Sequence, residues 1–193
     1  MTQTDKKKKI SMKIRILVEC GIMIALAQIL SFLKLYEFPN GGSVDLGMVP
    51  IIFFAVRHGF GWGAGAGFVY GFLQYVIGNG FAIDWTTILC DYFLAYTVLG
   101  FGAGLFPRKK WSAYVGTLIG GGLRFLAHYI IGAVVWGKWM PDTFFGMTMT
   151  TPWFYSFLYN GSYMFIDIVI CLVVFALLSK PMAKYFVGAD LQK

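Results

Sequence analysis

The stretch GGGLRFLAHYIIGAVVWG, residues 120–137, decides the fold of this chain. It is apolar enough to lie as a helix in a lipid bilayer. It nevertheless carries Arg124 and His128, four residues apart on one helical face, with Trp136 two turns further on. Ionisable side chains inside a membrane helix are costly and mark functional sites by default. The stretch therefore predicts a spanning helix that contributes polar groups to a buried site.

The composition of the whole chain is that of an integral membrane protein. Of its 193 residues, 58% are hydrophobic and only 13% are charged, whereas a soluble domain is about a quarter charged. The mean hydropathy is +0.68. The three cysteines lie inside apolar runs without metal-site spacing, so we interpret them as packing residues and expect neither a metal nor a cofactor. This length suits an all-α domain of about six helices.

Six apolar segments are predicted to cross the membrane, separated by turn-rich or basic loops. They are residues 12–34, 45–57, 59–78, 86–106, 111–136 and 153–180. A single transmembrane domain thus covers 1–193, with a basic tail over 1–11, a six-helix bundle over 12–180 and a second tail over 181–193. Segment 45–57 rises only about 20 Å, less than the ~30 Å of hydrocarbon. It is therefore extended, flanked by a thinned bilayer, or buried beside its neighbours.

Segment 59–78 begins with the glycine-rich run GFGWGAGAGFVYGFL, residues 59–73. It follows no predicted strand and has no Lys-Ser/Thr pair, so it is not a phosphate-binding loop. Small residues at this density favour close packing of one helix against another.

The distribution of charge predicts the orientation of the helices. The formal net charge is +7. With the N-terminus inside, all but three of the 16 lysine and arginine residues fall on the inner side, the exceptions being Lys34, Lys138 and Arg124. This positive-inside pattern places both termini in the cytoplasm. It also accounts for the basic charge without a nucleic-acid partner.

Three helices offer polar groups at similar depth in the outer half of the membrane. Helical rise places Asp91 about 8 Å, Asn160 about 10 Å and His128 about 12 Å from the outer ends of their helices, with Arg124 one turn deeper. Aromatic residues lie near this level: Tyr92, Trp136, Trp139, Trp153 and Tyr155. A carboxylate, hydrogen-bonding side chains and aromatic faces together suit a small, flat, cationic heteroaromatic ligand.

Other interpretations of these residues stay open. Asp91 and Arg124 also suit a structural ion pair, and His128 suits a core histidine bonded to a carbonyl oxygen. The tryptophans are each equally typical of an interfacial aromatic belt. Glu19, near the inner end of the first helix, is expected either to extend its carboxylate to the membrane surface or to pair with Arg15 one turn before it. Asp167, in the middle of the last helix, receives no assignment.

Four stretches of the sequence resemble one family. They are PNGGSVDLGMVPI (39–51), ILCDY (88–92), LRFLAHYIIGAVVWG (123–137) and FYSFLYNGSYM (154–164). The chain resembles, from about residue 12 to residue 180, the thiamine-specific substrate-binding subunits (S-components, ThiT or YuaJ type) of energy-coupling factor transporters. The resemblance implies an S-component-like helix bundle in the plasma membrane of a bacterium.

The resemblance also implies a set of site residues. Family members bind thiamine in an outward-facing pocket built by the fourth to sixth helices and covered by the loop that here spans 36–45. The matching pocket positions are Asp91, Tyr92, Arg124, His128, Trp136, Tyr155 and Asn160, with Phe81 at the border. Asp91 fills the position that recognises the aminopyrimidine. The sequence departs from the family where Asp91 replaces a frequent glutamate, Arg124 a lysine and Phe81 a tyrosine.

The family couples to its energising module through small residues on the first helix. Gly21 and Ala25 match this pattern here, although ordinary packing within the chain is the alternative. The chain has no Walker motif, so the resemblance implies a coupling transmembrane subunit and two ATPase subunits as partners. We therefore expect no enzymatic activity.

The leading hypothesis is a high-affinity thiamine-binding membrane subunit of such an importer. One alternative is an S-component for another vitamin, which only ligand binding would separate. A second is a stand-alone proton-coupled carrier that uses Asp91 or Asp167 as its relay. An intramembrane enzyme built on Asp91 and His128 is disfavoured because neither a second carboxylate nor a metal set is found at matching depth.

Overall fold

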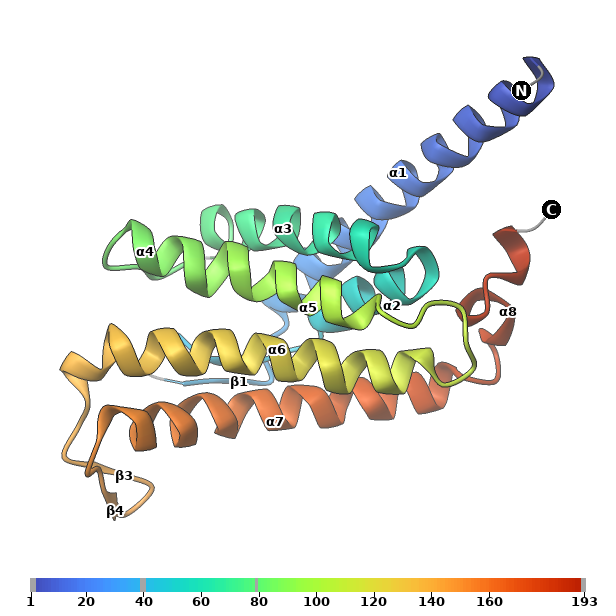
Figure 1. The fold of residues 1–193 in the computed structure, drawn as a ribbon. Coiled ribbons are helices and arrows are strands. Elements are labelled where there is room, and N and C mark those ends of the chain that lie inside the picture. Colours follow the sequence, from blue (N-terminus) through green and yellow to red (C-terminus); the bar gives the residue numbers. More distant parts are fainter. Residues whose placement is uncertain (1–2, 39–40, 79, 192–193) are drawn as a thin grey trace.

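The structure is a computed structural model that describes residues 3–38, 41–78 and 80–191. Helices dominate it, with two short antiparallel hairpins between them (Figure 1). In chain order the elements are α1 (Gln3–Phe32), β1 (Tyr36–Glu37), β2 (Ser43–Val44), α2 (Met48–His58), α3 (Phe60–Val76), α4 (Trp85–Thr87), the π-helix η1 (Ile88–Leu94), α5 (Ala95–Ala103), α6 (Ser112–Val134), the 3₁₀-helix η2 (Trp136–Trp139), β3 (Thr143–Phe144), β4 (Met147–Thr148), α7 (Pro152–Leu178), α8 (Ala183–Phe186) and the 3₁₀-helix η3 (Ala189–Leu191).

Each of the six predicted spans overlaps one helical stretch, which confirms an all-α membrane protein. Within the described ranges, four helices are long and apolar enough to cross a bilayer: Ile10–Phe32, Trp85–Ala103, Ser112–Val134 and Pro152–Leu178. The second of these joins α4, η1 and α5 end to end. Both predicted tails contain helical residues. Helix α1 already begins at Gln3, and the C-terminal segment carries α8 and η3.

The short helix α2 lies inside the bundle. All of its residues from Met48 to Arg57 are buried, and it packs against α1, α3, α5, α6 and α7. Of the three arrangements that its length allows, burial beside its neighbours is therefore the one observed. Pro50 is tolerated because it sits in the first helical turn, where a missing N–H breaks no intrahelical bond.

The glycine-rich helix α3 packs closely on the η1–α5 helix, as its sequence predicts. A Cβ atom added at Gly63, Gly67 or Gly71 would collide with a backbone carbonyl group of the facing helix. Those carbonyl groups belong to Gly100, Tyr96 and Tyr92, respectively. The absence of side chains thus brings Tyr92 and Tyr96 close to α3 and sets the width of the space beside them.

A cluster of charges ties the first helix to the chain's C-terminal segment. The prediction that Glu19 pairs with Arg15 is wrong: Glu19 Oε1 accepts from Arg57 Nε at 2.5 Å. Arg57 Nη2 also donates to Asp190 Oδ2 at 3.0 Å, and Arg15 Nη2 donates to the same oxygen at 2.7 Å. The Arg57 guanidinium holds the pKa of the Asp190 carboxyl below its usual range. Helix packing brings the Arg57 guanidinium into hydrogen-bonding distance of Glu19, although Arg15 lies only one helical turn away on α1.

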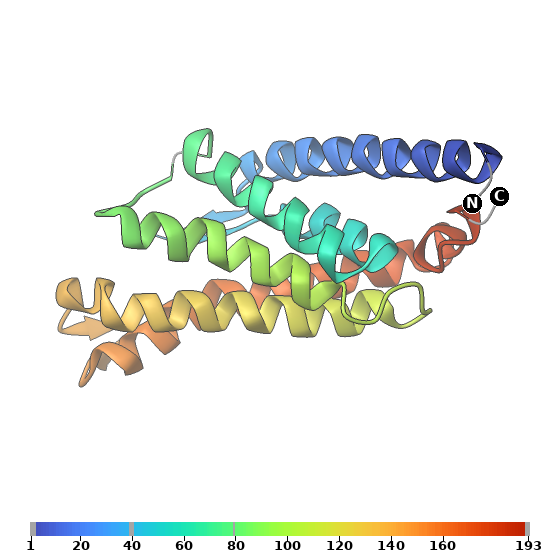
Figure 2. The ribbon, with the colours of Figure 1, turned by 45° about the horizontal axis from the view of Figure 1, so that its top comes forward.

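The two ends of the chain lie at the same end of the bundle (Figures 1 and 2). The helices α3, α5, α6 and α7 run alongside one another toward the opposite end, where η1, η2 and the β3–β4 hairpin lie (Figure 1). The candidate site is at this opposite end.

Candidate functional site

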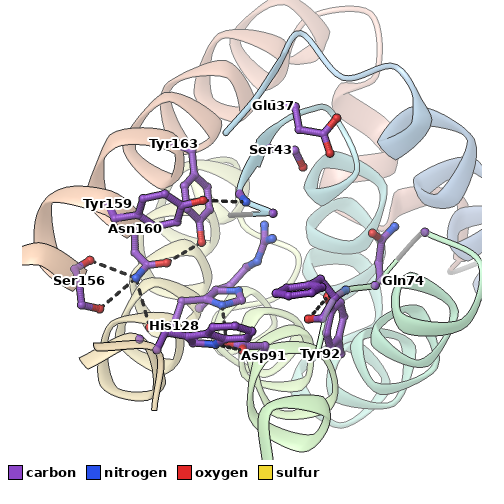
Figure 3. A pocket seen from close by; sticks show the side chains of 18 of the residues that line it. Glu37, Ser43, Gln74, Asp91, Tyr92, His128, Ser156, Tyr159, Asn160 and Tyr163 are labelled. Atoms are coloured by element: carbon purple, nitrogen blue, oxygen red, sulfur yellow. Dashed lines mark hydrogen bonds and ion pairs between the residues drawn. The ribbon is translucent and has the colours of Figure 1, made fainter. Parts of the chain in front are cut away.

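A cavity of about 470 Å³ opens among the helices at the end remote from the termini. Its walls come from the β1–β2 hairpin, the end of α3, η1, α6, η2 and α7. Figure 3 shows side chains from these elements pointing toward a common space. A cavity of this volume, with polar groups converging on it, has the size and character of a small-molecule site.

Asp91 is an acidic residue of the cavity wall whose two carboxylate oxygens each contact another side chain. Its Oδ1 lies 3.0 Å from Nδ1 of His128, and its Oδ2 accepts a hydrogen bond from Nε1 of Trp136 at 2.9 Å. These contacts hold the carboxylate and both rings in fixed positions. The other ring nitrogen of His128, Nε2, is buried and has no hydrogen-bond partner among the described residues. The His128 side chain itself lines the cavity.

The backbone around Asp91 is a π-helix rather than an α-helix. The segment η1 runs from Ile88 to Leu94, between the α-helical turns of α4 and α5. A π-helix turns less per residue than an α-helix, and such segments recur at functional sites. Here both Asp91 and its neighbour Tyr92 line the cavity.

Arg124 lies deeper in the cavity wall and is 8% exposed. Its Nη2 donates to the hydroxyl of Tyr96 at 3.0 Å, and its guanidinium carbon lies 4.5 Å from the centre of that ring. Its Nη1 is 3.8 Å from Oδ2 of Asp167. The predicted alternative of an Asp91–Arg124 ion pair is not what the structure shows, since each group has other partners. The Nε of Arg124 has no hydrogen-bond partner among the described residues.

Asn160 is held in place by its own helix and by α6. Its Nδ2 donates to the carbonyl and hydroxyl oxygens of Ser156, each at 3.0 Å, and to the carbonyl oxygen of His128 at 3.3 Å. Its Oδ1 accepts from the hydroxyl of Tyr163 at 2.7 Å. This network, visible in Figure 3, fixes the position of the amide in the cavity wall.

An aromatic shelf forms where the α3–α4 loop meets η1 and η2. The Phe81 and Trp136 rings lie 5.4 Å apart at an angle of 30°. The Tyr92 hydroxyl accepts from the backbone N–H of Phe81 at 2.7 Å and donates to its carbonyl oxygen at 3.1 Å. The loop is thereby fastened to the helix that carries Asp91.

The β1–β2 hairpin covers the cavity from a third direction. The backbone N–H of Gly42 donates to the hydroxyl of Tyr159 at 3.2 Å. The ring of Phe38 lies 5.8 Å from that of Tyr159 and 5.9 Å from that of Tyr163. Lys34 and Glu37, which both line the cavity, form an ion pair with each other at 2.6 Å.

The structure brings all eight residues singled out from the sequence for the pocket and its border to this cavity. They are Phe81, Asp91, Tyr92, Arg124, His128, Trp136, Tyr155 and Asn160. Of the three tryptophans expected nearby, Trp136 and Trp139 line it. The expectation for Trp153 is wrong, because this ring packs 5.4 Å from Tyr129 instead.

Several lining residues escaped the sequence reasoning. They include Gln74, Tyr96, Ser156, Tyr159 and Tyr163. The signal that could have found three of them is helical spacing: Ser156, Tyr159 and Tyr163 lie on the same face of α7 as Asn160. Gly21 and Ala25, by contrast, lie on an exposed face of α1 and away from the cavity, with open space beside Gly21.

The fold and the cavity place the chain among multi-pass helical membrane proteins that carry a cavity of small-molecule size at one end of the helix bundle. The particular family follows from comparison of the sequence. The chain belongs to the thiamine transporter protein family (Thia_YuaJ), whose model matches residues 17–187. It is thus a multi-pass protein of the bacterial plasma membrane, and the family is one of transporters, which confirms the expectation of a non-enzymatic protein.

Individual relatives agree with this assignment over nearly the full length. The chain is 34% identical to the thiamine transporter ThiT of Bacillus subtilis over 177 residues, 84% of this chain and 88% of that protein. It is 26% identical to ThiT of Lacticaseibacillus paracasei, over 91% of this chain and 92% of that protein. A solved structure of ThiT from Listeria monocytogenes superposes with a TM-score of 0.79 at 25% identity, covering 90% of this chain and 98% of that one.

Proposed function

We propose that this chain binds thiamine in the cavity described above, as the substrate-binding subunit of an energy-coupling factor importer. The observation that carries the proposal is the Asp91 carboxylate, held between His128 and Trp136 on the wall of a cavity of about 470 Å³. Thiamine joins an aminopyrimidine, which offers an amino group and ring nitrogens, to a permanently cationic thiazolium ring. A carboxylate beside aromatic faces suits both parts.

The cavity residues divide the recognition between them. Asp91 accepts from the amino group of the aminopyrimidine, and His128 offers the ring nitrogen Nε2 that has no partner in the described structure. The rings of Phe81 and Trp136 supply flat apolar surface for a cationic heterocycle. Asn160, Tyr92 and Tyr155 complete the polar and aromatic lining.

We further propose that both termini face the cytoplasm, so that the cavity opens outward. The positive-inside distribution of lysine and arginine supports this orientation. The exposed face of α1 around Gly21 and Ala25 is the proposed contact with the coupling transmembrane subunit, which two ATPase subunits energise. Replacing Gly21 with tryptophan should abolish thiamine uptake in cells while leaving thiamine binding to the purified chain unchanged. Unchanged uptake would contradict this interface.

Tryptophan fluorescence of the purified chain in detergent, titrated with thiamine, tests the binding function directly. Trp136 and Trp139 line the cavity, so we expect saturable quenching at nanomolar to low-micromolar ligand. Trp136→Phe should remove a large part of that signal. Trp153→Phe is the matched control and should retain it, since Trp153 packs outside the lining.

The absence of any response from an intact, monodisperse protein would contradict the proposal. A screen of other vitamins would then test the alternative S-component. Uptake by the chain alone in vesicles, driven by a pH gradient, would favour the proton-coupled carrier.

A further inference from the structure

Asp167 is a buried carboxylate that none of the proposed ligand contacts uses. It lies in the middle of α7 and is 1% exposed. Its two oxygens face different partners. Oδ1 accepts the backbone N–H of Asp45 at 3.1 Å, and Oδ2 lies 3.8 Å from Nη1 of Arg124. Burial of a carboxylate is unfavourable unless such partners compensate it, so this side chain has a specific task.

The first partner, Arg124, brings a positive charge to a cavity that is proposed to hold a cation. The charged residues that line the cavity are Lys34, Glu37, Asp91 and Arg124. Lys34 and Glu37 neutralise each other at 2.6 Å. If Asp167 neutralises Arg124, the charge left to face the ligand is that of Asp91. Without Asp167, the guanidinium would offset Asp91 and repel a cationic ligand in a medium of low dielectric constant.

The second partner lies at the base of the covering hairpin. Asp45 directly follows β2 and precedes α2, and its own carboxylate accepts from Ser43 Oγ at 3.0 Å and from the N–H of Gly47 at 2.7 Å. That carboxylate is therefore directed at the beginning of α2, whose N-terminal dipole favours a negative charge. The backbone N–H of Asp45 is left for Asp167. Asp167 thereby fixes the end of β2 to α7, while Phe38, which follows β1, packs against Tyr159 of the same helix.

We propose that Asp167 is a positioning residue that sets the ligand charge the cavity accepts and anchors the hairpin that covers it. Oδ2 neutralises Arg124, so that the cavity selects a monocation over a neutral molecule of the same shape. Oδ1 holds the hairpin base, so that a bound ligand is retained. This inference rests on the proposed thiamine-binding function and deepens it.

The test compares two ligands by isothermal titration calorimetry on the full-length chain in detergent. One is thiamine, and the other is its neutral isostere, in which carbon replaces the charged ring nitrogen. Asp167→Asn keeps an acceptor for the N–H of Asp45 but removes the charge. It should raise the Kd of thiamine about tenfold or more, while the Kd of the isostere changes far less. Combining it with Arg124→Gln removes both charges and should restore the preference for thiamine over the isostere.

The hairpin contact has its own readout. Asp167→Ala removes the acceptor as well, so we expect faster dissociation of both ligands in stopped-flow measurements. Asp167→Asn should restore slow dissociation of the isostere. A purely structural role would instead weaken both ligands equally in every variant.

Asp190→Asn is the matched control, because it removes one negative charge from the opposite end of the bundle. It should leave both affinities unchanged. If Asp167→Asn weakens thiamine and the isostere to the same extent, with wild-type binding intact, the inference is wrong and the proposed function stands. If the wild-type chain binds no thiamine, the proposed function fails and the inference falls with it.

Discussion

Replacing Asp91 with asparagine is the sharpest test of the candidate site. The variant keeps the shape of the side chain and an oxygen that accepts from Trp136 Nε1 or faces His128 Nδ1, while the negative charge is lost. A hydrogen bond to a charged group contributes about 1.5–3 kcal/mol, compared with about 1 kcal/mol for a neutral one. The difference is about 0.5–2 kcal/mol, and since every 1.4 kcal/mol is tenfold in affinity, Asp91→Asn raises the Kd of thiamine by about twofold to about thirtyfold. Asp91→Ala, which also frees the two rings, should exceed tenfold.

The assay is equilibrium titration of thiamine by calorimetry or tryptophan fluorescence, with thermal melting of the empty protein to establish that the variant is folded. Glu37→Gln is the matched control, because it also removes one negative charge from the cavity lining. Glu37 is 55% exposed and already paired with Lys34, so its removal should change the Kd by less than about threefold. An Asp91→Asn variant that binds thiamine as tightly as the wild type would refute the assignment of Asp91.

Three further predictions concern the fold that supports the cavity. Arg57→Met should destabilise the protein by about 3 kcal/mol, seen as a lower melting temperature in detergent, because Glu19 and Asp190 lose the guanidinium between them, although Glu19 keeps His58 as a partner. A melting temperature within a degree of wild type would contradict this. Because the pKa of Asp190 is lowered in the folded protein, its ion pairs stabilise the fold fully above the carboxyl's unfolded pKa of about 3.9. This contribution is lost as the pH falls through the folded pKa. Melting curves across acidic pH should show the loss in wild type but not in Asp190→Asn. Gly67→Leu should weaken thiamine binding and lower the melting temperature, because the leucine side chain must push the Tyr96 backbone and the η1–α5 helix away from α3. Unchanged binding would show that the close approach of these two helices does not shape the cavity.

Much of the architecture was predictable from the sequence because hydropathy and charge act locally along the chain. The apolar runs predicted the six helical stretches, and the glycines of α3 predicted its close packing on the η1–α5 helix. The stretch 120–137 was correctly predicted to be largely helical, and its residues Arg124, His128 and Trp136 all line the cavity. Each of these inferences needs only residues within one continuous helical segment.

Which side chains contact one another in the cavity wall could not be predicted in the same way. Asp91 and Arg124 both lie in the outer half of the membrane and are opposite in charge, which made a direct ion pair reasonable. The structure instead places Asp91 against His128 and Trp136, and Arg124 against Tyr96 and Asp167. Which groups meet depends on how each helix is rotated about its axis and on the π-helical turns around Asp91, neither of which hydropathy encodes.

Hydropathy and charge along the chain are sufficient to predict a helical membrane protein, the positions of its helices and the polar residues that are costly enough to require a function. These properties follow from transfer of side chains into lipid, which depends on composition and period. Other contacts became known from the packed fold alone. Glu19 pairs with Arg57 rather than Arg15, Trp136 lines the cavity while Trp153 does not, and Asp167 contacts both Arg124 and the base of the covering hairpin. Those contacts join residues far apart in the chain, and helix packing alone brings them within hydrogen-bonding distance.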